Sequence, residues 1–131
     1  MNGDVNLSNL KLSKIPIKFG RVSGYFHCLG NSLITLDGSP SYVGGYFVCR
    51  KNRLISFEGA PSYVGLDFYC NGNPIHEVYS LFNTPKCFEP INEYDVIQGR
   101  SIILSRLEEV YHDLKMQIPD KFNFKYYRLI D

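Results

Sequence analysis

A sequence motif that returns every 21 residues constrains the fold of this chain more than any other feature. The chain reads VGGYFVC at 43–49, and close copies stand at 22–28 and 64–70. Other columns keep the same spacing: Asn31, Asn52 and Asn73; Leu33, Leu54 and Ile75; Leu36, Phe57 and Val78. Repeats at one fixed offset indicate a solenoid of stacked coils, in which each coil buries its apolar face only against its neighbours.

Each unit carries the signature of a short β-strand with one buried face. Phe and Cys alternate with outward residues, which is the two-residue period of a strand. The Asn that follows stands where the chain turns out of the strand, and its amide can bond backbone groups that no neighbouring strand reaches. We therefore predict a parallel sheet held by three structural ladders, which consist of Phe26, Phe47 and Phe68; Cys28, Cys49 and Cys70; and Asn31, Asn52 and Asn73.

The repeats and the remainder of the chain are predicted to form one domain over 1–131. Residues 22–82 hold three repeats, and residues 5–21 hold a degenerate first unit with apolar residues at the matching offsets, which gives about three and a half units. Because a solenoid must cover its exposed last coil, residues 83–131 are expected to form a helical C-terminal cap and tail. The predicted fold class is therefore α/β, a short solenoid with a parallel sheet and a helical cap.

Apolar spacing predicts the elements of the cap. Residues 90–97 show one apolar helical face that begins with a proline, and residues 101–116 show a longer one that ends before Pro119. The tail at 122–126 alternates like a strand or an extended packing arm. The longer amphipathic helix either covers the last coil or binds a partner, and the sequence leaves both possibilities open.

The repeat resembles that of the leucine-rich repeat family. Apolar residues stand around an Asn at the family's spacing, with Phe and Cys at the two inward positions that normally hold Leu. In one unit these positions are Phe47, Cys49, Asn52, Leu54 and Phe57. The form Val-Gly-Gly-x-Phe-x-Cys-x-x-Asn-x-Leu is similar to short repeat proteins encoded by tailed phages and other large viruses. The resemblance implies a leucine-rich-repeat solenoid, and its viral form implies a host protein as the target or a place in the virion.

The outward strand positions form the candidate binding surface, which on a leucine-rich repeat sheet is the concave face. Tyr and Arg are the side chains most enriched at interface hot spots. Outward aromatic residues also stabilise sheets by cross-strand packing, so a binding role and a structural role both remain open. The predicted partner-binding residues are Tyr25, His27, Tyr46, Val48, Arg50, Asp67, Tyr69 and Asn71.

Charge and cysteine usage argue against several other function classes. Fourteen Lys and Arg against thirteen Asp and Glu give a net charge of +1, which argues against a dedicated nucleic-acid binder. No apolar stretch is long enough for a membrane span.

Three of the four Cys share one inward column and no close Cys pair exists, so free core thiols are expected, with no metal and no cofactor. Cys87 lies outside that column, and a structural role for it is favoured over a nucleophile.

We therefore expect a non-catalytic protein–protein interaction module in the cytoplasm, with a protein partner whose identity the sequence does not give. If the viral resemblance holds, the protein is an adaptor or inhibitor of a host protein. The alternative is a structural component that associates with itself or with a virion. This alternative arises because the degenerate first unit leaves a sheet edge available for pairing.

Overall fold

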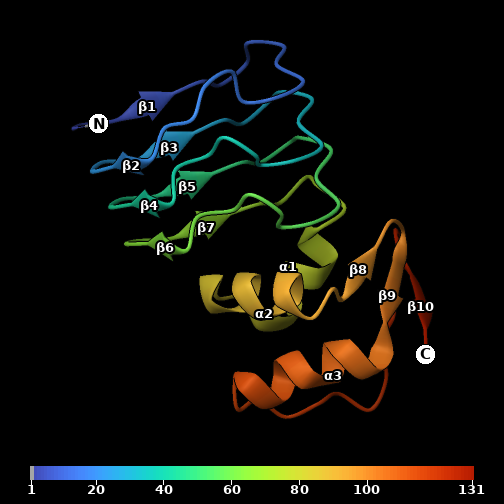
Figure 1. Cartoon of the computed structure of the whole chain (residues 1–131). Coiled ribbons are helices and arrows are strands. Elements are labelled where there is room, and N and C mark those ends of the chain that lie inside the picture. The colour runs from blue at the N-terminus through green and yellow to red at the C-terminus, as the bar shows by residue number, and fades with distance from the viewer. Residues whose placement is uncertain (1) are drawn as a thin grey trace.

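The computed structural model describes residues 2–131 and shows a parallel-sheet solenoid followed by a segment of helices and short strands (Figure 1). The main sheet contains four parallel strands in the order β1-β3-β5-β7. Its members are β1 (Val5–Asn6), β3 (Phe26–His27), β5 (Phe47–Val48) and β7 (Phe68–Tyr69). Val5 pairs with Phe26, Phe26 with Phe47, and Phe47 with Phe68, so each step of the sheet equals one 21-residue repeat. The predicted parallel solenoid is confirmed.

A second parallel sheet runs beside the first and was not expected from the sequence. Its order is β2-β4-β6, with β2 (Arg21–Val22), β4 (Tyr42–Val43) and β6 (Tyr63–Val64). Each strand has only two residues, which is too short for a two-residue alternation to be recognised in a sequence. The glycines that follow permit the close stacking of coils, because a Cβ on Gly44 would lie 2.1 Å from the carbonyl oxygen of Ser23.

The three Asn residues bind the backbone of two successive coils. The Nδ2 of Asn52 donates to the carbonyl oxygens of Cys28 and Cys49 at 2.9 and 3.0 Å, and its Oδ1 accepts the N–H of Leu33 at 3.0 Å. Asn73 repeats this pattern one coil later. Asn31 makes the corresponding bonds to the first coil. Each amide therefore satisfies buried backbone groups that the strand ladder leaves unpaired.

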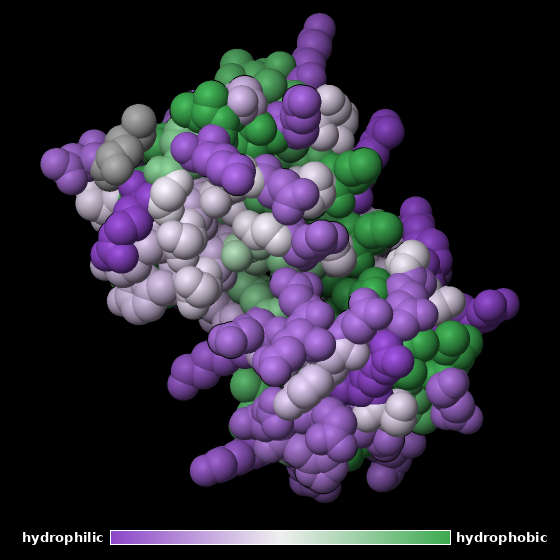
Figure 2. All heavy atoms as spheres, in the orientation of Figure 1, coloured by the Kyte–Doolittle hydropathy of each residue, from purple (hydrophilic) through white to green (hydrophobic). Residues whose placement is uncertain are grey.

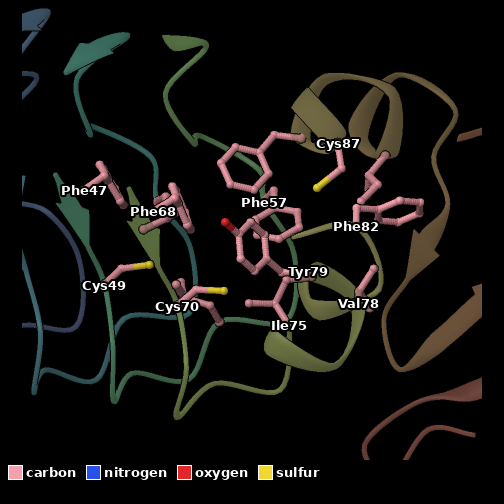
Figure 3. Packing of buried hydrophobic residues seen from close by; sticks show 14 of the residues in the cluster. Phe47, Cys49, Phe57, Phe68, Cys70, Ile75, Val78, Tyr79, Phe82 and Cys87 are labelled. Atoms are coloured by element: carbon pink, nitrogen blue, oxygen red, sulfur yellow. The ribbon is translucent and has the colours of Figure 1, made fainter. Parts of the chain in front are cut away.

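The Phe and Cys columns form the interior of the solenoid (Figure 3). The rings of Phe26 and Phe47 are stacked with centroids 5.5 Å apart, and those of Phe47 and Phe68 are 4.9 Å apart. The cysteines of the repeat column are almost fully buried free thiols. Each therefore packs as a small apolar side chain.

The segment after the coils holds three helices, a 3₁₀ turn and a third sheet. The helices are α1 (His76–Phe82), α2 (Phe88–Glu93) and α3 (Leu104–Asp113), and the 3₁₀ turn is η1 (Pro85–Cys87). The third sheet has the order β10-β9-β8, with β8 (Ile97–Gln98), β9 (Ser101–Ile103) and β10 (Arg128–Ile130). Helix α1 begins where earlier coils continue to a Gly-x-Pro turn, so the third repeat gives way to the helical segment before residue 82.

Three expected elements of this segment differ in the structure. The helix expected at 90–97 ends at Glu93, and Ile97 belongs to β8. The helix expected at 101–116 begins only at Leu104, because the preceding three residues pair with β10. Residues 122–126 form no strand, and the strand of the tail lies at 128–130, while Phe122 and Phe124 pack against the core as expected of an extended packing arm. The pairing of β9 with β10 joins residues 27 positions apart, a contact that local apolar spacing does not reveal.

Aromatic contacts join α1 and α2 to the last coil. The Phe57 ring lies 4.1 Å from Phe88 and 6.0 Å from Tyr79, and the Phe68 ring lies 4.3 Å from Phe88. Tyr127 from the tail donates its hydroxyl to the carbonyl oxygen of Ile55 at 2.8 Å. The helices therefore cover the apolar interior at the C-terminal end of the solenoid.

Candidate functional site

The outer face of the main sheet carries the candidate binding residues. Because Phe and Cys point inward, the residues between them point to the opposite side of the strands. The face, called the aromatic face below, consists of three rows: Tyr25, Tyr46 and Asp67; His27, Val48 and Tyr69; Leu29, Arg50 and Asn71. The middle row lies on β3, β5 and β7, and the other two rows flank these strands. The Asn side chains bond the backbone just after each strand.

Exposure differs strongly among these residues. Tyr46 and Tyr69 are 40% and 42% exposed, and Arg50 and Asp67 are also exposed. Val48 lies on the same face but is only 8% exposed, so it offers little contact area to a partner, contrary to the expectation for an outward residue. The remaining candidates, Tyr25, His27 and Asn71, are half-buried.

Ring contacts cross the aromatic face in two groups. The Tyr25 ring stacks on His27 of the same strand with centroids 4.1 Å apart. The Tyr46 ring stacks on Tyr69 of the next strand with centroids 6.1 Å apart. The contact between Tyr46 and Tyr69 therefore stabilises the sheet by cross-strand packing, and it leaves both tyrosines accessible.

The surroundings of Tyr69 and His27 shift the pKa values of both side chains. The hydroxyl of Tyr69 lies 3.2 Å from Oδ2 of Asp67, and this hydrogen bond together with the carboxylate charge raises the pKa of Tyr69. Burial lowers the pKa of His27, and the nearby Asp4 carboxylate partly offsets this effect. The imidazole is therefore largely neutral at pH 7, and the face carries the opposite charges of Arg50 and Asp67.

The cysteines are poorly placed for chemistry. Cys87 is fully buried, and burial raises the pKa of its thiol well above the usual value. The Cys70 sulfur lies 3.9 Å from Nδ1 of His76, but burial raises the pKa of Cys70 to about 12, so the pair does not generate a thiolate at neutral pH. No group of three or more His, Cys, Asp or Glu side chains within residues 2–131 is arranged to hold a metal ion.

Sequence reasoning missed an aromatic pair on the second sheet. The rings of Tyr42 and Tyr63 stack with centroids 4.7 Å apart, and the Arg21 guanidinium lies 4.1 Å above the Tyr42 ring. Tyr63 is 50% exposed. The signal was the repeated Ser-Tyr-Val at 41–43 and 62–64, which has the same 21-residue spacing as the other columns.

Comparison of the chain with protein-family models, with curated proteins and with solved structures finds no match. Within residues 2–131, none of the helices combines the length and the apolar character that a membrane crossing requires. The geometry of the described side chains is therefore the basis for the functional proposal.

Proposed function

We propose that this protein is a non-catalytic recognition module that binds a protein partner through the aromatic face. The observation that carries the proposal is the exposed group of Tyr46, Tyr69 and Arg50 on a rigid sheet. Tyr and Arg supply a large share of the binding energy at protein interfaces. Because the Tyr46 and Tyr69 rings already contact each other, binding would cost little side-chain entropy.

The dimensions of the main sheet limit the shape of the partner surface. Four strands spaced by about 4.8 Å span about 14 Å, so the aromatic face is small beside a standard interface of about 800 Å² per partner. A protruding loop or a single helix of the partner would fit such a face. A larger partner would also contact the loops that follow the strands.

We place this activity in a reducing cytoplasm. The structure contains buried free thiols at Cys28, Cys49, Cys70 and Cys87, and cytosolic conditions maintain thiols in that form. The resemblance of the repeat to leucine-rich repeats and to virus-encoded repeat proteins leads us to propose a host protein as the target, with the chain acting as an adaptor or inhibitor.

Affinity purification with face variants tests the proposal. The tagged protein and its Tyr46→Ala/Arg50→Glu variant are used to capture partners from lysate of the native or infected cell. The matched control is Tyr63→Ala/Arg128→Glu, which makes the same changes at exposed residues outside the aromatic face. A stoichiometric partner that is lost only with the face variant supports the proposal. Equal recovery with both variants would refute the aromatic face as the site.

The first coil favours a second candidate function, self-association or attachment to a larger assembly. Among residues 2–131, β1 bonds β3 alone. The N–H groups of Val5 and Leu7 point to β3, so the backbone groups of the residue between them, Asn6, point to the open side. Leu10 and Ile17 are 55% and 60% exposed, and Figure 2 shows apolar side chains gathered over this end of the solenoid. An open strand edge beside apolar side chains is a surface suited to pairing.

Sedimentation velocity over a range of concentrations distinguishes this second function. Self-association through the first coil should disappear in Leu10→Lys/Ile17→Lys. It should persist in Ile34→Lys/Met116→Lys, which changes exposed apolar residues elsewhere. A protein that stays monomeric at all concentrations would exclude self-association.

A further inference from the structure

The hydrogen-bond ladder of the main sheet ends at β7 with a regular row of unpaired donors. In each earlier coil, three alternate N–H groups donate to carbonyl oxygens of the next coil at 2.7–3.1 Å. In the second repeat these donors are Phe47, Cys49 and Lys51, which bond the carbonyl oxygens of Asp67, Tyr69 and Asn71. The equivalent N–H groups of the last coil belong to Phe68, Cys70 and Gly72, and within residues 2–131 no carbonyl oxygen accepts them.

A groove of about 340 Å³ lies beside this edge. Strand β7 and its flanking residues form one wall, and His76 and Tyr79 of α1 with Asn83 and Pro85 form the other. Helix α1 starts directly after the last coil and turns beneath the apolar interior, where the Tyr79 ring contacts Phe68 at 5.4 Å (Figure 3). The interior is thus covered while the strand edge faces the groove.

We propose that this groove binds an extended segment of a partner protein as a fifth strand, parallel to β7. The donors from Phe68 to Gly72 span about 13 Å at the rise of a β-strand, which corresponds to about five residues of the partner. Three carbonyl oxygens at alternate residues of that segment would accept the three free N–H groups, as in other cases of strand addition to a sheet edge.

The occupant is a single extended segment and not another coil of a second copy. Helices α1 and α2 occupy the space beyond the last coil, where Phe88 lies 4.1 Å from Phe57 (Figure 1). The strand β1 of a second copy is part of a coil, because the Asn31 side chain holds the N–H groups of Leu10 and Leu12. A whole coil would therefore collide with the helices, whereas a free segment needs only the groove.

The side chains of the groove specify a basic segment. Asp67 is the acidic residue in the lining, it is exposed, and it forms no ion pair within the described residues. Its Oδ2 lies near the Tyr69 hydroxyl, which leaves Oδ1 available to a cation. Leu66, 55% exposed, and Pro85 add apolar surface to the same groove. A Lys or Arg beside an apolar residue therefore matches the lining in charge and in polarity.

This site shares Asp67, Tyr69 and Asn71 with the aromatic face, but it binds through the backbone donors at the edge of the main sheet. Tyr46 and Arg50 do not line the groove. Loss of capture by Tyr46→Ala/Arg50→Glu therefore tests the aromatic face, whereas protection of the three edge amides tests the groove.

A display library of random nonapeptides is selected for binding to the 131-residue chain, and a synthetic peptide of the most enriched sequence then serves as the probe. Amide hydrogen exchange by NMR then locates the peptide. In the free protein the amides of Phe68, Cys70 and Gly72 should exchange faster than those of Phe47 and Cys49, because only the latter are bonded. Saturating peptide should slow exchange of the three edge amides at least tenfold.

Charge reversal gives the second readout. With Asp67→Lys, the selected peptides should be enriched in Asp and Glu in place of Lys and Arg, and the affinity for the original peptide should fall at least tenfold. The matched control Asp120→Lys changes another exposed aspartate and should alter neither the selected sequences nor the affinity. The proposal is overturned if no sequence is enriched, if the peptide protects amides other than those at the β7 edge, or if Asp67→Lys binds it as the unaltered protein does.

Discussion

Substitution of the central ladder residue, Asn52→Ala, is expected to destabilise the protein far more than an ordinary polar change. The Asn52 side chain is 8% exposed and forms four hydrogen bonds that join two coils. Alanine removes every one of them, and the backbone groups of Leu33, Cys28 and Cys49 that lose a partner are buried.

The loss of stability depends on which backbone groups keep another hydrogen bond after Asn52→Ala. The N–H of Leu33 loses its one acceptor, and a buried donor without a partner costs about 1–3 kcal/mol. The carbonyl oxygens of Cys28 and Cys49 each keep one bond, from Asn31 and Asn73 respectively, so each loss there costs about 0.5–1 kcal/mol. The sum is about 2–5 kcal/mol, a large part of the stability of a domain.

Urea unfolding followed by far-ultraviolet circular dichroism measures this loss; the chain has ten Tyr and no Trp, so tyrosine fluorescence is a second probe. Asn31→Ala should lower the free energy of unfolding less, because Asn31, which bonds the first coil, is half-buried and water can replace part of its bonding. Asn123→Ala, at an exposed tail residue, is the control and should change the free energy of unfolding by less than about 0.5 kcal/mol. If Asn52→Ala unfolds at the same urea concentration as this control, the bonding role assigned to the ladder is refuted.

Three further predictions concern thiols, packing and the aromatic face. Burial raises the pKa of Cys28 from 9.0 to about 12, so thiol reagents at pH 8 should label this thiol only when the protein unfolds. Between pH 9 and pH 12 the thiol ionises in the unfolded chain but not in the folded protein. The free energy of unfolding in urea should therefore fall as the pH rises from about 9 to about 12. Gly44→Ala places a Cβ 2.1 Å from a carbonyl oxygen of the preceding coil and should lower the free energy of unfolding by about 1–3 kcal/mol in urea titrations; an unchanged value would contradict the observed coil spacing. Asp67→Asn removes the carboxylate that raises the pKa of Tyr69, so an NMR titration of the tyrosine rings should show that pKa falling toward its ordinary value; no fall would exclude the Asp67 contact.

The candidate site shows where prediction from the sequence stops. The repeat identified the outward rows, because strand alternation decides which side chains leave the core. It did not reveal that Val48 is nearly buried, since its exposure depends on the side chains around it in the folded sheet. The groove beside β7 was also absent from the prediction, because its second wall comes from α1 and the residues that follow it.

The solenoid, its 21-residue step and the inward columns of Phe, Cys and Asn could be predicted from the repeat alone. This is possible because each coil meets a neighbour of the same kind, so one local pattern is repeated in one repeated environment. The layout of the C-terminal segment, in which β9 pairs with β10 and α1 covers the core, depends on long-range packing. Those contacts join dissimilar residues with no common period, and the strand edge they leave open at β7 follows from that packing.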